Sequence, residues 1–552
     1  MVPLLIWFSS WTEGKGMLNG FFRGRRKYYV VAAFFLLVPV VLAAAVSNSA
    51  SGESRVDMLE IELPDRTKMP AVTFLHDQHT GAMPDQGCET CHPQENGKYV
   101  FDYKKAGTLA YEAATAFYHD DCAGCHRKMA SGGKEAGPRI GQCRECHVEE
   151  TGFESAWKPI EFDRSLHFRH VNAEAITFKP EQYDQNCGAC HHVYDEKLEK
   201  TVYRKGEEGS CRYCHLEQKK ENTRSYREAA HDSCVNCHKG LSARGTKTGP
   251  VDCAGCHSAK GQAKIDTLKD VPRLKTKQPD AVLMAAWLDE AEKQDKLPDQ
   301  LTFPVAFNHV GHEAAVGSCR QCHHASMDRC DKCHTSRGDK EGGFVSLETA
   351  MHSEKSAIGC IGCHEQVKEK ADCAGCHDQM ADKPFADRDC RQCHAVPPET
   401  LKPLPLDAET RREIARTVVA ERRETPERVP DEKIPEKVKI DIMVDEYQAA
   451  EFPHRKIVHA LAERTKENDL ATAFHQKPET LCMGCHHNSP ASLNPPRCAS
   501  CHKVAGPQAD GRPGLLGAYH GQCIGCHTKM NIEKPAATDC AACHKKRSVE
   551  TR

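Results

Sequence analysis

The sequence predicts a mainly α-helical and irregular fold with little β-sheet, arranged as tandem domains whose cores are not built from side chains alone. Three observations support this prediction. The chain of 552 residues is polar, with 39% hydrophobic, 6% aromatic and 28% charged residues, and so polar a chain has too little apolar area for several large cores. It nevertheless holds 32 cysteines and 32 histidines, which is not a composition typical of disorder. The spacing of these residues also repeats along the chain.

The N-terminal residues are predicted to form an export signal. A basic cluster from Arg23 to Lys27 precedes an uncharged apolar run over 28–46, and Ala45 lies at a plausible cleavage point. We therefore assign residues 1–46 to a signal peptide and the mature protein to the periplasm, with membrane association only through a partner complex. An uncleaved anchor is the alternative, although the run is short for a span.

The charge balance bears on partners. The leader holds five basic residues and one acidic residue, which leaves 70 basic against 77 acidic residues in the mature chain, a net charge of −7. Such a surface would attract a basic protein partner. A nucleic-acid partner is disfavoured, because no basic face or aromatic-basic run is present.

Every cysteine belongs to a Cys-x-x-Cys-His motif, and there are sixteen such motifs. Their cysteine pairs are Cys88 and Cys91, Cys122 and Cys125, Cys143 and Cys146, Cys187 and Cys190, Cys211 and Cys214, Cys234 and Cys237, Cys253 and Cys256, Cys319 and Cys322, Cys330 and Cys333, Cys360 and Cys363, Cys373 and Cys376, Cys390 and Cys393, Cys482 and Cys485, Cys498 and Cys501, Cys523 and Cys526, and Cys540 and Cys543. The motif is the attachment signature of c-type haem. Disulfides and zinc ribbons are the alternatives, but neither needs a histidine after every second cysteine. The sequence therefore predicts sixteen covalently bound haem c groups.

The histidines divide into two equal sets. The motif histidines, predicted as proximal iron ligands, are His92, His126, His147, His191, His215, His238, His257, His323, His334, His364, His377, His394, His486, His502, His527 and His544. The others, predicted as distal ligands, are His76, His79, His119, His167, His170, His192, His231, His309, His312, His324, His352, His454, His459, His475, His487 and His520. Two imidazoles saturate an iron, which suits low-potential electron transfer and leaves no position for a substrate. We therefore expect an electron carrier and not an enzyme.

A repeat of about 80–110 residues organises these motifs, and residues 167–257 show it most fully. This unit begins with His167 and His170, separated by two residues, and continues with a haem motif that is directly followed by His192. Three more haem motifs follow, and His231 stands just before the second of them. The same order recurs over 309–377. Residues 76–147 lack both the doubled histidine and one haem motif, so this unit has three motifs.

These units resemble the tetrahaem class III cytochromes c of sulfate-reducing bacteria. The resemblance implies that His167, His192, His170 and His231 serve the haems at Cys187, Cys211, Cys234 and Cys253, and that His309, His324, His312 and His352 serve those at Cys319, Cys330, Cys360 and Cys373. The missing haem of the first unit is the one that the missing doubled histidine would have ligated in this family.

The last unit departs from the family pattern. His454, His459 and His475 precede it without a clean His-x-x-His pair. Three irons, at Cys390, Cys482 and Cys523, need these ligands, and the sequence leaves their assignment open. If one histidine does not reach its iron, that haem would be five-coordinate. The alternative function is therefore a multihaem reductase with one open iron, although no Cys-x-x-Cys-Lys motif is present. A conductive filament is a third possibility.

The order of three, four, four, one and four motifs resembles that of the high-molecular-weight, sixteen-haem cytochromes c of the same bacteria, over residues 70–545. The domains implied are a trihaem domain over 51–155, tetrahaem domains over 156–262, 301–380 and 451–552, an isolated haem segment over 381–400, a helical linker over 263–300 and a charged linker over 401–450. By this resemblance, electrons come from periplasmic hydrogenase, through a small basic tetrahaem cytochrome, and pass to a membrane-bound redox complex in sulfate respiration.

The two linkers lack cysteine and histidine. Residues 279–293 have apolar residues at helical spacing, and Glu409–Glu424 form a charged amphipathic pattern typical of a helix. Residues 437–443 alternate as in a short strand.

Overall fold

The computed structural model describes residues 58–61, 69–83, 86–149, 155–176, 178, 186–274, 276–288, 302–380, 387–402, 406–424, 426–443 and 446–547. The predicted signal peptide lies outside these residues. The chain forms two compact units. The first comprises the described residues up to His92, with Asp102–Pro159 and Cys253–Lys260, and the second comprises Pro93–Phe101, Ile160–Asp252 and the described residues from Gly261 onward. Across the described ranges, no helix combines the length and the apolar composition that a membrane crossing requires.

The first unit is mainly helical. Its elements are β1 (Met58–Ile61), β2 (Val72–Leu75), α2 (His76–Ala82), η1 (Cys88–Thr90), η2 (Tyr103–Thr108), α3 (Tyr111–Ser131), α4 (Cys143–Cys146) and α7 (Cys253–His257). Strands β1 and β2 are antiparallel, with Met58 opposite Leu75. Because β2 ends where α2 begins, the hairpin fixes the start of the helix that carries the first two histidines.

The second unit holds the other elements. Up to residue 284 these are β3 (Gln94–Glu95), β4 (Lys98–Tyr99), α5 (Arg164–Val171), η3 (Asn186–Ala189), β5 (Val193–Asp195), β6 (Lys200–Val202), η4 (Cys211–Tyr213), α6 (Tyr226–Ala243) and β7 (Ala281–Met284), while α8 (Ala259–Gln262) lies at the boundary between the units. Beyond residue 300 they are β8 (Val305–Asn308), α10 (His309–Ala315), η5 (Cys319–Gln321), η6 (Cys330–Lys332), α11 (Leu347–His352), α12 (Cys360–Lys368), α13 (Ala371–His377), α14 (Asp387–Cys393), η7 (Pro398–Leu401), α15 (Ala408–Glu421), η8 (Asp431–Lys433), β9 (Val438–Ile440), β10 (Ala450–Phe452), α16 (His454–Lys466), α17 (Asp469–Phe474), α18 (Glu479–Met483), η9 (Cys498–Ser500), α19 (Leu515–Lys529) and α20 (Cys540–Cys543).

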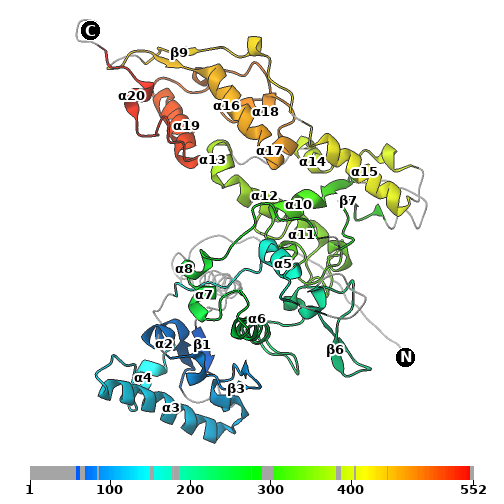
Figure 1. Cartoon of the computed structure of the whole chain (residues 1–552). Helices are drawn as coiled ribbons and strands as arrows, with labels where there is room; N and C mark the ends of the chain where they lie inside the picture. Colours follow the sequence, from blue (N-terminus) through cyan, green and yellow to red (C-terminus); the bar gives the residue numbers. More distant parts are fainter. Residues whose placement is uncertain are drawn as a thin grey trace, which may run out of the picture. The chain divides into compact units, whose positions relative to one another are not determined.

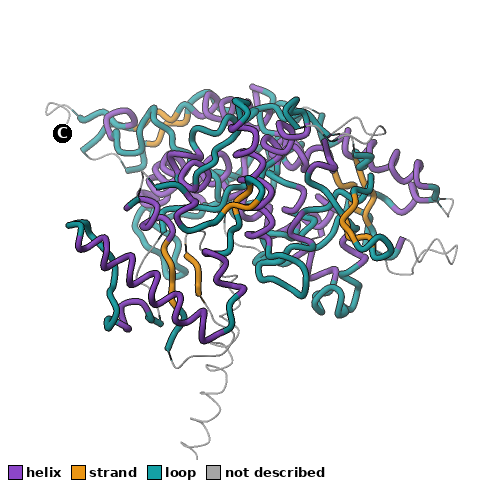
Figure 2. The backbone as a smooth tube through the Cα atoms, turned by 60° about the horizontal axis from the view of Figure 1, so that its bottom comes forward, coloured by secondary structure: helices purple, strands orange, loops and turns teal. Residues whose placement is uncertain are grey.

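Helices and loops dominate, and the strands of the described residues form five antiparallel two-stranded sheets. Figure 2 shows these strands as short pairs among helical and irregular segments. The predicted mainly helical fold with little sheet is therefore confirmed.

The haem motifs fold as single turns. In ten of them the histidine N–H donates to the carbonyl oxygen of the first cysteine at 2.8–3.0 Å, as His92 does to Cys88. Residues four apart lie on the same face of such a turn, so the first cysteine and the histidine point the same way. Helix α13 ends at its motif, whereas α3, α6 and α19 run through theirs.

The two linkers pack on each other. Helix α15 confirms the predicted charged helix, and β9 confirms the predicted short strand. The helix predicted over 279–293 is wrong at Ala281–Met284, because these residues form β7, which pairs with β8. Helix α15 contacts both strands and lies beside β7 in Figure 1.

We call β7, β8 and α15 the linker module. Ala281 and Leu283 alternate on the buried face of β7, and they join Leu401 and Ala415 in one hydrophobic cluster. These residues form a strand despite their helical spacing, because β8 pairs with the backbone of β7 and α15 contacts both strands, so that alternate side chains of β7 can be buried. The linkers are thus a packed element of the second unit.

Candidate functional site

Histidine rings from distant parts of the sequence face each other in pairs. Each pair joins one motif histidine and one other histidine. The fourteen pairs are His76 and His92, His79 and His126, His119 and His147, His167 and His191, His170 and His238, His192 and His215, His309 and His323, His312 and His364, His324 and His334, His352 and His394, His377 and His475, His454 and His486, His487 and His502, and His520 and His544.

The distance between the paired rings fits one metal ion. The ring centroids lie 5.9–6.4 Å apart in all fourteen pairs. A metal–imidazole bond is about 2 Å long and a ring nitrogen lies about 1 Å from the ring centre, so two imidazoles on opposite sides of one metal have centroids about 6 Å apart. Rings in direct contact would lie closer together. The donor set and its spacing therefore fit a six-coordinate haem iron.

Local structure orients the distal rings. In α2, α5 and α10 the two histidines are three residues apart and lie on one face of the helix. The Nδ1 atoms of His79, His170 and His312 each lie 2.7 Å from the carbonyl oxygen four residues earlier. With Nδ1–H donating to that oxygen, the lone pair of Nε2 is free for a metal.

Prolines orient several proximal rings, and the sequence reasoning missed them. His126 Nδ1 lies 2.6 Å from the carbonyl oxygen of Pro138, and His238 Nδ1 lies 2.9 Å from that of Pro250. The residues before these prolines are Gly137 and Gly249, where an added Cβ would lie 2.7 and 2.5 Å from the imidazole ring. Only glycine allows the backbone so close to the ring. A Gly-Pro pair at the eleventh and twelfth residues after the motif histidine is the sequence signal that could have identified these prolines.

Burial keeps several of these imidazoles neutral. Desolvation lowers the pKa of His377 to about 4, with a further contribution from the adjacent His475. Desolvation is also the main cause that lowers the pKa values of His167, His364 and His475. A neutral imidazole is the form that binds a metal, so these sites present the required protonation state at neutral pH.

Most pairs follow the order implied by the family resemblance. In the tetrahaem region over 167–257, the rings of His167, His170 and His192 face the motif histidines implied for them. The third repeat, over residues 309–377, shows the same order for its first three pairs. The first repeat, over residues 76–147, has three pairs. His231 and His257 belong to compact units that are described separately, so their pairing stays a prediction.

One implied pairing needs correction. The resemblance assigned His352 to the haem at Cys373, but the ring of His352 faces His394, of the motif at Cys390. The ring of His377, in the Cys373 motif, faces His475 instead.

Tertiary packing explains this exchange. Helix α13 packs against α19 in the last repeat, where a Cβ on Gly375 would lie 2.3 Å from Met530 Cγ. This contact holds His377 next to the last repeat. The Cys390 motif lies against the third repeat, because His394 Nδ1 lies 2.6 Å from the carbonyl oxygen of Phe303, just before β8.

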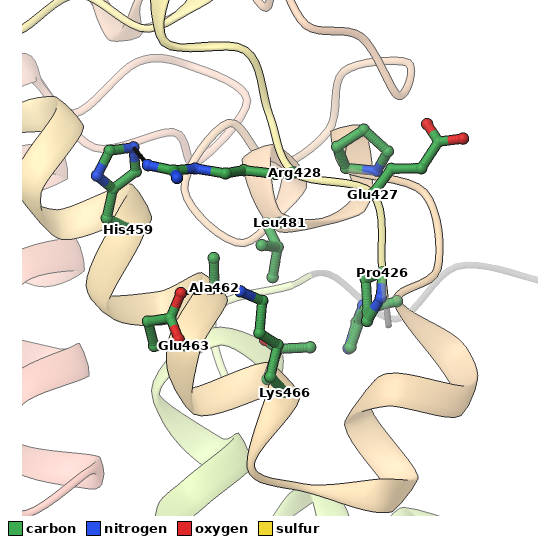
Figure 3. Close-up of a pocket in the computed structure, with 11 residues that line it drawn as sticks. Pro426, Glu427, Arg428, His459, Ala462, Glu463, Lys466 and Leu481 are labelled. Atoms are coloured by element: carbon green, nitrogen blue, oxygen red, sulfur yellow. Dashed lines mark hydrogen bonds and ion pairs between the residues drawn. The ribbon is translucent and has the colours of Figure 1, made fainter. Parts of the chain in front are cut away.

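Two of the three unassigned histidines have motif partners. His454 faces His486, and His475 faces His377. His459 instead lies with Nε2 3.1 Å from Asp431 Oδ1 and 3.5 Å from Arg428. Figure 3 shows His459 and Arg428 pointing toward each other at one side of a cavity of about 250 Å³.

The motif at Cys523 differs from the others of the last repeat. His527 Nδ1 lies 2.9 Å from the carbonyl oxygen of Pro535, which orients the ring as in other proximal histidines. Within the described residues, no histidine ring is found opposite His527, and the nearby His520 faces His544.

Comparison with known proteins places these features in a family. The family model of the class III cytochrome c family matches residues 56–147, 148–257, 285–394 and 449–545. The third of these matches includes the motif at Cys390.

Full-length relatives match as well. A high-molecular-weight cytochrome c from Nitratidesulfovibrio vulgaris (strain Hildenborough) is 43% identical over 512 residues, covering 90% of this chain and 93% of that protein. A crystal structure of high-molecular-weight cytochrome c from Desulfovibrio vulgaris (Miyazaki F) aligns with a TM-score of 0.71 at 42% identity, over 91% of this chain and 99% of that one. The sixteen-haem cytochrome from Desulfovibrio gigas aligns with a TM-score of 0.73 at 38% identity, over 89% and 99%. With sixteen motifs that attach sixteen covalent haem c groups, the chain belongs to the class III cytochrome c family and is a multihaem electron-transfer protein.

Proposed function

We propose that this chain is a periplasmic electron conduit in which nearly every iron is held by two histidines. The observation that carries the proposal is the set of fourteen histidine pairs with ring centroids 5.9–6.4 Å apart. Haem iron supplies one-electron redox chemistry. In each pair the two imidazoles would hold the iron from opposite sides, so electron transfer would require no ligand exchange and little reorganisation. We assign ligation of iron to all thirty-one histidines other than His459.

The physiological route is the finer part of the proposal. Electrons enter from hydrogenase through a small basic tetrahaem cytochrome and leave to a membrane-bound redox complex in sulfate respiration. The net charge of −7 of the mature sequence supports a basic donor, because opposite charges accelerate encounter. The family resemblance supports the acceptor and the pathway.

The first test counts haems and their ligands in the purified holoprotein. Pyridine haemochrome quantification should give sixteen haems per chain. Low-temperature EPR of the oxidised protein should show low-spin iron at all sites except one. Several high-spin haems per chain would contradict the assignment of the histidine pairs as axial ligands.

A second test addresses the donor. The rate of reduction by a small basic tetrahaem cytochrome should fall as the ionic strength rises, because salt screens the attraction between the partners. A rate that does not depend on salt would rule out electrostatic docking. An acidic cytochrome of similar potential serves as the matched control.

The second candidate function is binding or reduction of a small molecule at the haem on Cys523. Two observations favour it. His527 faces no histidine among the described residues, and His459, the spare histidine, contacts Asp431. A haem with one axial histidine has an open position, which an exogenous ligand can occupy.

Carbon monoxide tests this candidate. The reduced holoprotein should bind one carbon monoxide per chain, and a His527→Ala variant should change the spectrum of that complex. A His459→Ala variant is the control and should bind the same amount of carbon monoxide, because His459 is engaged elsewhere. Absence of binding in the wild type would exclude the open site.

A further inference from the structure

One distal histidine faces a carboxylate. Glu313 lies four residues after His309 in α10, and its Oε1 lies 2.6 Å from His309 Nδ1. The side chains of His309 and Glu313 are only 21% and 16% exposed. The carboxylate oxygen lies outside the angular range of an aligned hydrogen bond, and among the described residues no other polar atom bonds to this nitrogen. Glu313 is therefore the nearest acceptor for the Nδ1–H of His309.

The carboxylate is held in place by a cation. Arg273 donates from Nε to Glu313 Oε2 and from Nη2 to Oε1, both at 2.9 Å. Gln278 Nε2 lies 3.5 Å from Oε2. Arg273 in turn pairs with the more exposed Asp280. Because the arginine binds with two parallel hydrogen bonds, the carboxylate is fixed in orientation and its negative charge is paired with a cation.

The sequence of the other repeats differs at this position of the helix. The residues four positions after the equivalent histidines, His76, His167 and His454, are Thr80, Val171 and Val458. The neighbouring distal ring in the same helix, His312, directs its Nδ1 to the carbonyl oxygen of Asn308 at 2.7 Å. An acidic residue four positions after the first distal histidine therefore occurs in the third repeat and not at the equivalent position of the others.

We propose that Glu313 is a positioning residue that lowers the reduction potential of the haem on Cys319 by accepting the Nδ1–H of His309. This inference rests on the proposed function, because it requires His309 to ligate that iron opposite His323. With Nε2 directed to an iron, the Nδ1–H of His309 would have the Glu313 carboxylate, 2.6 Å away, as its acceptor. A carboxylate acceptor makes the imidazole a stronger electron donor. Oxidised iron, which has the higher charge, is stabilised more than reduced iron, so the potential falls.

The test is a redox titration of the full-length holoprotein and its Glu313→Gln variant. Glutamine keeps the size of the side chain and removes its charge. At a fixed potential, the ratio of oxidised to reduced iron at one haem should fall about tenfold, equivalent to a rise of about 59 mV in its midpoint for a one-electron couple. The remaining midpoints should stay within error. The EPR signal of one low-spin haem should shift in the same variant, a change that a purely structural role would not produce.

The matched control is Asp280→Asn. This variant removes one negative charge that is paired with the same Arg273 and leaves Glu313 in place. Equal shifts in the two variants would overturn the inference, because the effect would then be a general one of charge. If Glu313→Gln binds fewer haems, Arg273→Gln takes its place and should lower the potential. An unchanged or higher potential there would also overturn the inference.

A His309→Ala variant separates this inference from the proposed function. Conversion of one low-spin haem to a high-spin haem shows that His309 ligates iron. Without that conversion, the proposed ligation fails. If His309→Ala produces the high-spin haem but Glu313→Gln leaves every midpoint potential unchanged, only the role of Glu313 is contradicted.

Discussion

The linker module and the last repeat differ in how they are stabilised. In the linker module and the segment packed on it, Leu288, Val396, Leu401 and Ala415 are at most 2% exposed and belong to one cluster of side chains. Among the described residues 446–547, by contrast, Leu515 and Met530 are the only buried hydrophobic side chains. That repeat holds four haem motifs and the linker module holds none.

The difference shows that one chain uses two kinds of core. Where haems are attached, their macrocycles would supply the apolar surface that a core needs, and side chains would supply ligands and attachment points. Where none is attached, an ordinary cluster of aliphatic side chains is required. Haem content and packing should therefore contribute separately to the stability of the two regions.

Removal of all haems should have the largest effect. Chain exported in a host without the haem-attachment machinery should lose most of its helical signal in far-UV circular dichroism, because the repeats then lack both ligand bonds and core. If the haem-free protein kept its native helical content and unfolded cooperatively, side chains alone would suffice to form the cores of the repeats. The contrast between the two regions would then be wrong.

Loss of one distal ligand should have a local effect on the haems. His475→Ala should produce one additional high-spin haem, at Cys373, and weaken the link between α13 and the last repeat. His352→Ala is the matched variant and should affect the haem at Cys390. EPR, combined with removal of each haem by changing its cysteines to alanine, identifies the site. If His352→Ala altered the Cys373 haem, the corrected pairing would be wrong.

Truncation in the linker module should destabilise only that region. Leu401→Ala removes a fully buried side chain, and such a change costs about 2–5 kcal/mol. Amide hydrogen exchange should speed up in β7, β8 and α15, while the haem count and the EPR spectrum stay unchanged. The exposed Leu516→Ala serves as control and should change neither measurement.

The smallest effect should come from a helix cap in a haem-bearing region. The Ser225 hydroxyl accepts from the Glu228 N–H at 3.3 Å, and the Glu228 carboxylate accepts from the Ser225 N–H at 2.8 Å, which together form a capping box for α6. Ser225→Ala should cost about 1 kcal/mol, measured as faster exchange in the first turn of α6. Ser242→Ala, at the other end of the helix, should have no such effect. A large loss of haem in Ser225→Ala would mean that local helix stability, and not ligation, controls this region.

Local features were predictable from sequence. The Cys-x-x-Cys-His motif carries its own attachment chemistry within one helical turn, so the number of haems follows from counting. Several histidine pairs within one repeat, such as His167 and His191, are those that the resemblance to the class III cytochromes c implies. The charged helix α15 follows from its apolar face, on which Ile414 and Val418 lie four residues apart.

Long-range choices needed the tertiary structure. His352 and His475 precede several motifs, and sequence order does not say which iron each one reaches. Packing of α13 against α19 and the anchoring of His394 at Phe303 bring each histidine to its motif partner. The same holds for β7, whose apolar spacing suits a helix until β8 and α15 are present to bury its alternate residues. The sequence by itself determined the haem-attachment sites, because each motif consists of residues close together in the chain. Only the tertiary structure decided which histidine faces a motif histidine of another repeat, as His475 faces His377, because that depends on how separate repeats pack.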